Sequence, residues 1–328
     1  MIAIDAVEAA AHRLQNVAVR TPLIRNAELD AIAGGAVLIK PECFQRTGSF
    51  KIRGAYNLLA QLSPEQAACG VVAWSSGNHA QGVAAAGKML GIQTAIVMPE
   101  DAPAAKLDNT RRLGGEIITY DRYTGDREAI ARALAAERGA EIVPSYDHPD
   151  IIAGQGTVGL EIAAQANELG ETPDRVLICC GGGGLTAGCA IALKALLPRV
   201  EIVTVEPEAF DDTARSLELG RRVRIAPSSR SICDALLADT PGEMTFEINS
   251  RLVSFGVTVS DDDVKRAMRF AFRHLKIVVE PGGAVALAAV LAGKIDTAGK
   301  STAVVLSGGN VDVDVFAAIQ SERVSDPD

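Results

Sequence analysis

Short apolar segments that alternate with helical patterns constrain the fold of this chain more than any other feature. Strands separated by helices cannot pair through tight turns, so we expect them to pair in parallel, with helices on both faces of each sheet. The expected strands are residues 36–40, 71–74, 92–98, 116–120, 141–143, 175–180, 200–205 and 302–306. The expected helices are residues 4–14, 49–62, 79–90, 104–113, 126–138, 154–169, 186–197, 262–275 and 283–291, and residues 207–231 are expected to be irregular. Because a second series begins after Pro149, the sequence predicts an α/β fold with two mostly parallel sheets.

Composition narrows the classes of partner. The 32 Lys and Arg residues are outnumbered by 41 Asp and Glu residues, and the net charge of −9 argues against nucleic acid or an anionic membrane surface as the main partner. The opening MIAIDAVEAA lacks the basic and apolar regions of a signal peptide, and the apolar stretch 284–293 is too short to span a bilayer. The six cysteines form no C-x-x-C pair, which favours buried reduced thiols. We therefore expect a cytoplasmic protein with no membrane partner.

A run of four glycines, Gly181 to Gly184, follows the strand 175–180 and precedes a helix. Bare backbone N–H groups at the positive end of a helix form a good cradle for a phosphate. The same stretch also satisfies G-x-G-x-x-A through Gly182, Gly184 and Ala187, and Glu206 follows about where a ribose-binding acid belongs. A nicotinamide-dependent oxidoreductase is therefore an alternative to other phosphate-binding enzymes.

Two further turns and one lysine stand out. The turn Ser75 to His79 carries more polar groups than one helix cap requires, so it could bind a small carboxylate, although simple capping also explains it. The turn Ser307 to Asn310 follows the last strand and is weak evidence alone. Lys51 lies near a helix start, where the helix dipole disfavours a cation. A solvated surface residue is the ordinary explanation of an isolated lysine, and the functional interpretation is a free amine that attacks a carbonyl.

Taken in order, GSFKIRGA (48–55), SSGNHAQG (75–82), GGGGL (181–185) and SGGN (307–310) resemble the pyridoxal-phosphate enzymes related to tryptophan synthase β. The chain is most similar to the serine/threonine dehydratase and serine racemase branch, in particular to its short catabolic members, from Arg20 to Asp312. The resemblance implies a tryptophan synthase β-like fold. It also implies a large cofactor-binding domain of residues 1–69 and 147–328, with a small domain of residues 70–146 inserted in it.

The resemblance also implies roles for individual residues. Lys51 would bind pyridoxal phosphate covalently and later act as general base, and Ser76 would deliver a proton to the opposite face. The cofactor would contact Phe50 at its ring, Gly181, Gly182, Gly183, Gly184 and Leu185 at its phosphate, Asn78 at its ring hydroxyl and Ser307 at its ring nitrogen. The substrate carboxylate would lie in the loop of Ser75, Ser76, Gly77, Asn78 and His79.

The implied reaction is β-elimination of ammonia from L-threonine or L-serine to give a 2-oxo acid. The alternatives within the branch are amino-acid racemisation and dehydration of 3-hydroxyaspartate, for which His79 or Arg53 could supply the extra cationic or donor group. A magnesium or calcium ion held by Glu206, the Phe210 carbonyl and Asp212 is also implied, although a solvated acidic loop explains the same residues. A homodimer, or a tetramer built from two such dimers, is the expected assembly.

Overall fold

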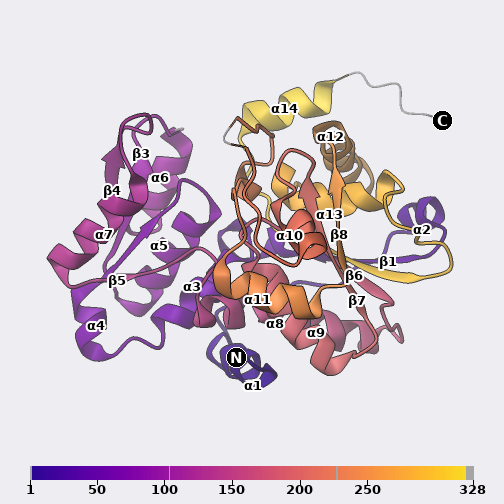
Figure 1. Ribbon diagram of the computed structural model, residues 1–328, viewed down its shortest axis with the longest axis horizontal. Coiled ribbons are helices and arrows are strands. Elements are labelled where there is room, and N and C mark those ends of the chain that lie inside the picture. Colours follow the sequence, from indigo (N-terminus) through magenta and orange to yellow (C-terminus); the bar gives the residue numbers. More distant parts are fainter. Residues whose placement is uncertain (1, 103, 227, 323–328) are drawn as a thin grey trace.

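The computed structural model describes residues 2–102, 104–226 and 228–322, and they form two sheets in which every strand pair is parallel. The larger sheet has the order β1 (Ala36–Pro41), β9 (Ser301–Leu306), β6 (Arg175–Cys179), β7 (Glu201–Pro207) and β8 (Phe255–Val259). The smaller sheet has the order β4 (Gly115–Tyr120), β3 (Thr94–Pro99), β2 (Val71–Trp74) and β5 (Glu141–Ile142). The two sheets lie side by side in Figure 1, and the predicted α/β fold class is confirmed.

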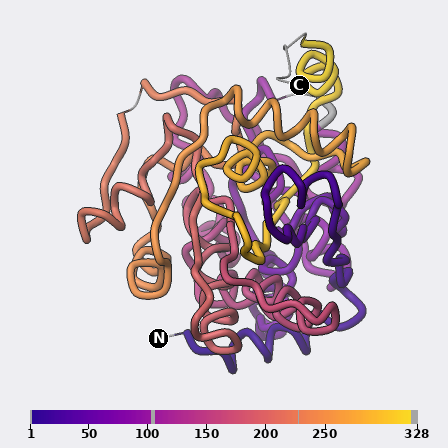
Figure 2. Tube along the Cα trace, turned by 90° about the vertical axis from the view of Figure 1, so that its right-hand side faces the viewer, coloured from indigo at the N-terminus to yellow at the C-terminus, as the bar shows by residue number. Residues whose placement is uncertain are grey.

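Helices cover both sheets. Those built around the smaller sheet are α4 (Pro64–Cys69), α5 (Asn78–Leu90), α6 (Ala104–Arg112) and α7 (Arg127–Arg138). Those around the larger sheet are α1 (Ile4–Arg13), α2 (Ala27–Ala33), α8 (Pro149–Glu168), α9 (Gly184–Leu196), α10 (Asp212–Leu219), α11 (Glu243–Leu252), α12 (Asp261–Phe270), α13 (Pro281–Leu291) and α14 (Val313–Ser321). In the two views of Figures 1 and 2, α1 and α14 lie at opposite ends of the molecule.

One helix joins the two halves. The helix α3 (Lys51–Leu59) packs against α5 on the side of the smaller sheet and against α8 on the side of the larger one. Short turns flank these elements: η1 (Glu42–Phe44), η2 (Arg46–Gly48), η3 (Asp234–Leu236) and the π-helical η4 (Ala271–Leu275). The helix α3 therefore contacts both halves. The domain boundaries that the resemblance implies, residues 1–69 and 147–328 for the large domain and 70–146 for the small one, stay a prediction.

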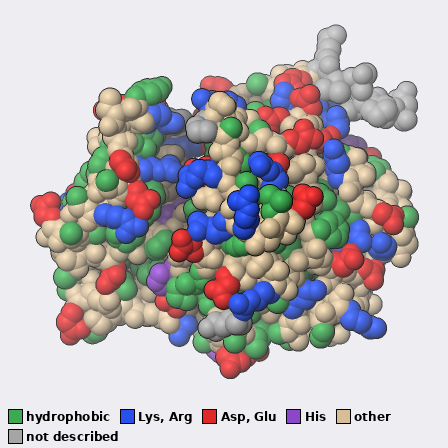
Figure 3. Space-filling view, viewed as in Figure 1, with side chains coloured by type: hydrophobic (Ala, Val, Ile, Leu, Met, Phe, Trp, Pro, Cys, Tyr) green, Lys and Arg blue, Asp and Glu red, His purple; other side chains and the backbone are tan. Residues whose placement is uncertain are grey.

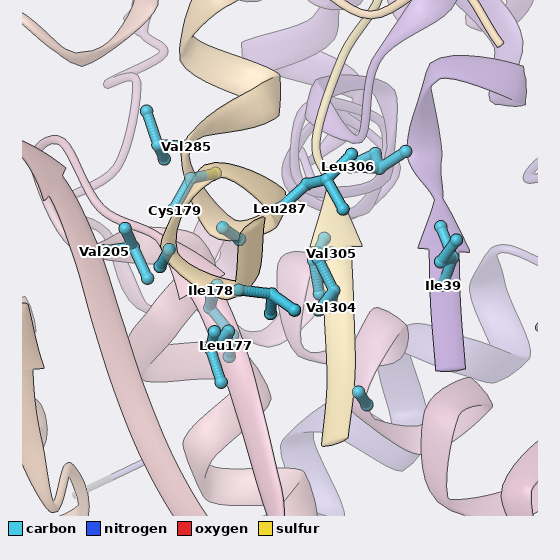
Figure 4. Packing of buried hydrophobic residues seen from close by; sticks show 14 of the residues in the cluster. Ile39, Leu177, Ile178, Cys179, Val205, Val285, Leu287, Val304, Val305 and Leu306 are labelled. Atoms are coloured by element: carbon cyan, nitrogen blue, oxygen red, sulfur yellow. The ribbon is translucent and has the colours of Figure 1, made fainter. Parts of the chain in front are cut away.

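The central strands of the larger sheet are buried on both faces. Figure 4 shows Leu177 and Ile178 of β6 near Val304 and Val305 of β9, with Leu287 of α13 packed against them. Burial on both faces removes the need for alternating polar residues, which is why these strands are continuous apolar runs in the sequence. The rigid sheet fixes the carboxyl ends of its strands, from which the polar turns project.

Several elements differ from the sequence-based expectation. The helix α10 lies inside the stretch expected to be irregular, because both oxygens of the buried Glu206 carboxylate accept backbone N–H groups of its first turn, from Thr213 and Ala214. The helix α8 starts at Pro149, five residues earlier than expected, with proline at its first position and the His148 ring as its cap. The elements α2, α4, α11, β8 and α14 were not expected. Among the described residues, no helix has the length and apolar character that crossing a membrane requires.

Candidate active site

A cavity of about 1430 Å³ lies between the two sheets, at the carboxyl ends of their strands. Figure 3 shows one face of the molecule hollowed between its two halves, with Lys and Arg side chains near the hollow. The cavity lining includes every residue that the resemblance assigned to cofactor or substrate: Phe50, Lys51, Ser75, Ser76, Gly77, Asn78, His79, Gly181, Gly182, Gly183, Gly184, Leu185 and Ser307. Four segments that are separated in the sequence therefore meet at one site.

Lys51 is the first residue of α3, and its Nζ donates a hydrogen bond to the Ser145 carbonyl oxygen at 2.8 Å. The Phe50 ring centroid lies 5.3 Å from the same Nζ. Burial lowers the pKa of Lys51 from 10.5 to about 8, although Cys179 and Glu280 act in the opposite direction. A larger share of the amine is therefore unprotonated near neutral pH, as a nucleophile or base requires.

The glycine run forms a bare backbone cradle. Gly183 has φ +93°, which favours glycine, and a Cβ added at Gly182 would lie 2.3 Å from the Tyr146 ring. The helix α9 starts at Gly184 without a side-chain cap, so its first N–H groups stay available for an anion. The Thr245 hydroxyl donates to the Gly182 carbonyl oxygen at 2.7 Å, and the Asn249 amide donates to that of Gly183 at 3.4 Å.

The polar turn after β2 leads directly into α5. The Ser75 hydroxyl accepts the Gly77 N–H at 3.1 Å, but in the described structure no side chain caps α5, so simple capping does not explain this turn. His79 Nε2 donates to the Val143 carbonyl oxygen at 2.8 Å. Burial, and to a lesser degree Lys51, lowers the pKa of His79 to about 3, so this ring is neutral and does not supply a cation.

The turn after β9 packs against the segment that precedes Lys51. Ser307 is buried, and its carbonyl oxygen accepts the Phe50 N–H at 3.2 Å. Cys179 lines the cavity and interacts with the Ser307 side chain, while burial raises the pKa of its thiol to about 11. Cys179, Cys180, Cys189 and Cys233 are buried and in no disulfide, as expected, but Cys43 is half-buried and Cys69 is exposed, so the expectation of buried thiols does not hold for all six.

Arg53 does not reach the cavity. Its guanidinium is 1 % exposed and forms ion pairs with Glu42 at 2.8 Å and Glu161 at 2.7 Å. The expectation that Arg53 could contact an acidic substrate is therefore wrong, because both edges of its guanidinium bind carboxylates inside the protein. A long basic side chain two residues after Lys51 gives no sequence signal of this burial.

The predicted metal ligands lie outside the cavity lining, apart from Phe210. Both carboxylate oxygens of Asp212 are buried without a hydrogen-bond partner, and burial raises its pKa to about 7. Burial and Asp212 also raise the pKa of Glu206. No set of three or more His, Cys, Asp and Glu side chains in the described part of the chain is arranged to hold a metal ion. Since Glu206 is fully buried and bound to α10, it is not available to a nucleotide ribose.

The cavity lining includes residues to which the sequence analysis gave no role, among them Tyr146, Glu280, Lys106 and Asn310, the last named there only as the end of a turn. Lys106 of α6 pairs with Asp234 of η3 at 2.9 Å across the two halves. Glu280 directly precedes α13. Only the folded structure brings these side chains to the site.

A buried amine beside a phosphate cradle defines an enzyme that can hold a phosphorylated aldehyde cofactor through a covalent link. Comparison with known proteins agrees: the family of pyridoxal-phosphate dependent enzymes matches residues 14–309. The chain therefore belongs to the pyridoxal-phosphate dependent enzymes.

Individual relatives extend this result. The chain is 44 % identical over 310 residues to an L-threo-3-hydroxyaspartate ammonia-lyase from a Pseudomonas species, covering 94 % of this chain and 96 % of the relative. It is 39 % identical to a serine racemase of Schizosaccharomyces pombe, covering 97 % of both. The solved structure of a threonine deaminase from T.th. has a TM-score of 0.88 and 43 % identity, covering 94 % of this chain and 99 % of that one. The predicted family, fold, cofactor and lyase class are confirmed, with racemases as the isomerase alternative.

Proposed function

We propose that this enzyme removes ammonia from a β-hydroxy amino acid by β-elimination and releases a 2-oxo acid. The observation that carries the proposal is the buried Lys51 amine, which lies in one cavity with the glycine run and the polar turn of α5. Pyridoxal phosphate, when bound, supplies the electron sink that acidifies the Cα proton. The bare cradle of Gly181 to Gly184, with Leu185 beside it, fits its phosphate, and Phe50 would lie against its ring.

The chain's own residues would divide the work as follows. The uncapped N-terminus of α5, with Ser75 and Ser76, would hold the substrate carboxylate. The Lys51 amine would take the proton from Cα, and the β-hydroxyl would leave as water. Asn78 and Ser307 would bind the polar atoms of the cofactor ring. Ser76 would also supply a proton on the face opposite Lys51, which gives racemisation as a side activity.

Two arginines that line the cavity, Arg122 and Arg127, favour a substrate with a second carboxylate. Arg127 lines the cavity, and its side chain makes no hydrogen bond or ion pair with any described residue, whereas Arg122 pairs with Asp101 at 2.9 Å. A free guanidinium at the mouth can bind a β-carboxylate through two hydrogen bonds. L-threo-3-hydroxyaspartate therefore joins L-threonine and L-serine as a candidate substrate, in agreement with the Pseudomonas relative.

A substrate panel tests the proposal. With all three amino acids, the 2-oxo acid and the opposite enantiomer should both be measured, and we expect 2-oxo acid as the main product. Lys51→Ala should abolish turnover and the visible absorption band of the bound cofactor; a variant that retains both would refute the proposal. Arg127→Ala should lower kcat/KM for 3-hydroxyaspartate at least about tenfold relative to threonine, the loss expected for one charged hydrogen bond. Arg122→Ala is the matched control and should leave that ratio unchanged.

We also propose a magnesium or calcium ion at Glu206, the Phe210 carbonyl and Asp212. The support is the unpaired buried carboxylate of Asp212, since a buried charge without a partner is costly and a cation would relieve that cost. Assembly into a homodimer or tetramer stays a prediction, which the mass of the purified protein in solution tests.

A further inference from the structure

Glu280 is a buried carboxylic acid in the wall of the cavity, with 3 % of its surface exposed. It precedes α13, and its backbone N–H donates to the Gly308 carbonyl oxygen at 3.0 Å. A Cβ added at Gly308 would lie only 2.3 Å from Glu280 Oε1. The glycine in the turn after β9 is therefore what admits this carboxylate to the site.

A directed chain of hydrogen bonds ends at Glu280. The Thr47 carbonyl oxygen can only accept, and Asn310 Nδ2 donates to it at 2.7 Å. The same Nδ2 donates to Asn78 Oδ1, also at 2.7 Å. Asn78 therefore turns its oxygen toward Asn310 and its nitrogen toward Glu280, whose Oε1 accepts from Asn78 Nδ2 at 2.6 Å. One backbone carbonyl thus determines the orientation of two side-chain amides.

The Thr47 carbonyl, where this series of hydrogen bonds begins, is itself held in place by its surroundings. Thr47 has φ +64°, an uncommon conformation for a β-branched residue, and it lies in η2 just before Lys51. The following Gly48 carbonyl oxygen accepts the Gly309 N–H at 2.9 Å. A Cβ added at Gly48 would lie 2.5 Å from Asn310 Oδ1. The direction in which the Thr47 carbonyl points is therefore fixed by contacts on both sides.

We propose that Glu280 and Asn310 are positioning residues, which hold the Asn78 amide so that an N–H group faces the cavity. Nδ2 of Asn78 carries two hydrogens, of which Glu280 accepts one. The second can donate to the ring hydroxyl oxygen of pyridoxal phosphate, the contact that the proposed role of Asn78 requires. A reversed amide would set its nitrogen against the nitrogen of Asn310, so that two donors face each other and this hydrogen bond is lost. The inference rests on the cofactor role proposed for Asn78.

Cofactor affinity of the apoenzyme is the direct readout. Trp74, the only tryptophan of the chain, lines the cavity, so quenching of its fluorescence reports the binding of pyridoxal phosphate. Glu280→Met removes the acceptor and should weaken binding about tenfold, the loss expected for one hydrogen bond. Glu280→Gln keeps an oxygen acceptor and should bind nearly as well as the native protein. Asn310→Asp removes the donor and should resemble Glu280→Met.

A double-mutant cycle separates positioning from a general loss of structure. Asn78→Ala should weaken binding to a similar degree, and Glu280→Met should add little when Asn78 is already alanine. Effects that add fully in the double variant, or a Glu280→Gln protein as weak as Glu280→Met, would overturn the inference. If Glu280→Met does not fold, Asn310→Asp takes its place: it should weaken cofactor binding in the native protein and add little in the Asn78→Ala protein. Native protein that binds the cofactor but shows no lyase activity would instead refute the proposed function.

Discussion

Removal of Arg53 tests whether buried charges fix the helix that carries Lys51. The Arg53 guanidinium donates to both oxygens of Glu42 at 2.8 Å and to both oxygens of Glu161 at 2.7 and 2.9 Å. Lys40, which is fully buried, pairs with Glu161 at 2.6 Å. Two cations and two carboxylates thus join α3 to η1, β1 and α8. The group has no net charge, which is what makes its burial tolerable.

Arg53→Met leaves the shape of the side chain largely filled but removes its charge. The Glu42 carboxylate, with no exposed surface, then keeps only the Thr21 hydroxyl at 2.7 Å and the more distant Lys40. Breaking a buried pair in this way costs about 3–5 kcal/mol. That is a large part of the roughly 5–15 kcal/mol by which a folded protein is typically stable. Adding Glu42→Gln removes the unpaired charge and should recover at least half of the loss.

The effect should depend on pH in a defined direction. Burial alone would raise the pKa of Glu42, yet Arg53 lowers it below 4.5 in the folded protein. Ionised Glu42 therefore stabilises the native fold above pH 4.5, and this contribution is lost as the pH falls through the lowered pKa. Without Arg53, burial raises the pKa of Glu42, so the deficit of the variant should be largest at neutral pH and shrink in acid.

Urea denaturation followed by circular dichroism at several pH values measures these free energies. Arg20→Met is the control, because Arg20 and Glu168 form an ion pair with side chains 52 % and 57 % exposed. An exposed pair contributes less than about 1 kcal/mol. An Arg53→Met protein within about 1 kcal/mol of the native one would refute the reasoning, since a broken buried pair must cost more. A double variant no more stable than Arg53→Met would refute it equally.

Three further predictions concern the cavity and its surroundings. Gly182→Ala places a methyl group against the Tyr146 ring, so the affinity for pyridoxal phosphate, measured by equilibrium dialysis, should fall by more than about tenfold. An unchanged affinity would contradict the proposal that the glycine run binds the phosphate. Because the pKa of His79 is lowered to about 3, the free energy of unfolding should fall as the pH drops from 6.5 toward about 3. His79→Gln can still donate to the Val143 carbonyl oxygen but does not titrate, so its free energy of unfolding should fall less over the same pH range. Asp212→Asn should raise the thermal midpoint of the metal-free protein and abolish any further rise caused by magnesium; a rise that persists would exclude this carboxylate as a ligand.

The parts of the site that lie in single strand–turn–helix segments could be predicted from sequence. Lys51 and the glycine run owe their positions to the segments on either side of them, and the family resemblance of their motifs implied that both belong to one cofactor site. Glu280 could not be assigned a role, because its partner Asn78 lies 202 residues earlier in the chain. Asn310 is hidden for the same reason, since its amide contacts Thr47 and Asn78 rather than its own turn.

The fold shows the same division between local and distant causes. Buried parallel strands are apolar throughout and were predicted, whereas α10 was missed. Its N-terminus is capped by Glu206, which lies at the end of the preceding strand rather than next to the helix. Arg53 was interpreted wrongly, because its carboxylate partners lie 11 and 108 residues away. Periodicity and spacing carry no information about which charges will be paired across such distances.

The neutrality of the buried ion network also bears on the chemistry of Lys51. Arg53 lies only two residues after Lys51 on α3, and an uncompensated charge there would act on the amine through a poorly screening interior. Glu42 and Glu161 pair with Arg53 and Lys40, and burial is the main cause that lowers the pKa of Lys51 to about 8, opposed by Cys179 and Glu280. The network can therefore anchor the helix without fixing the protonation state of its first residue. In the short segment 51–53, Arg53 therefore anchors the helix through its ion pairs while Lys51 keeps a reactive amine.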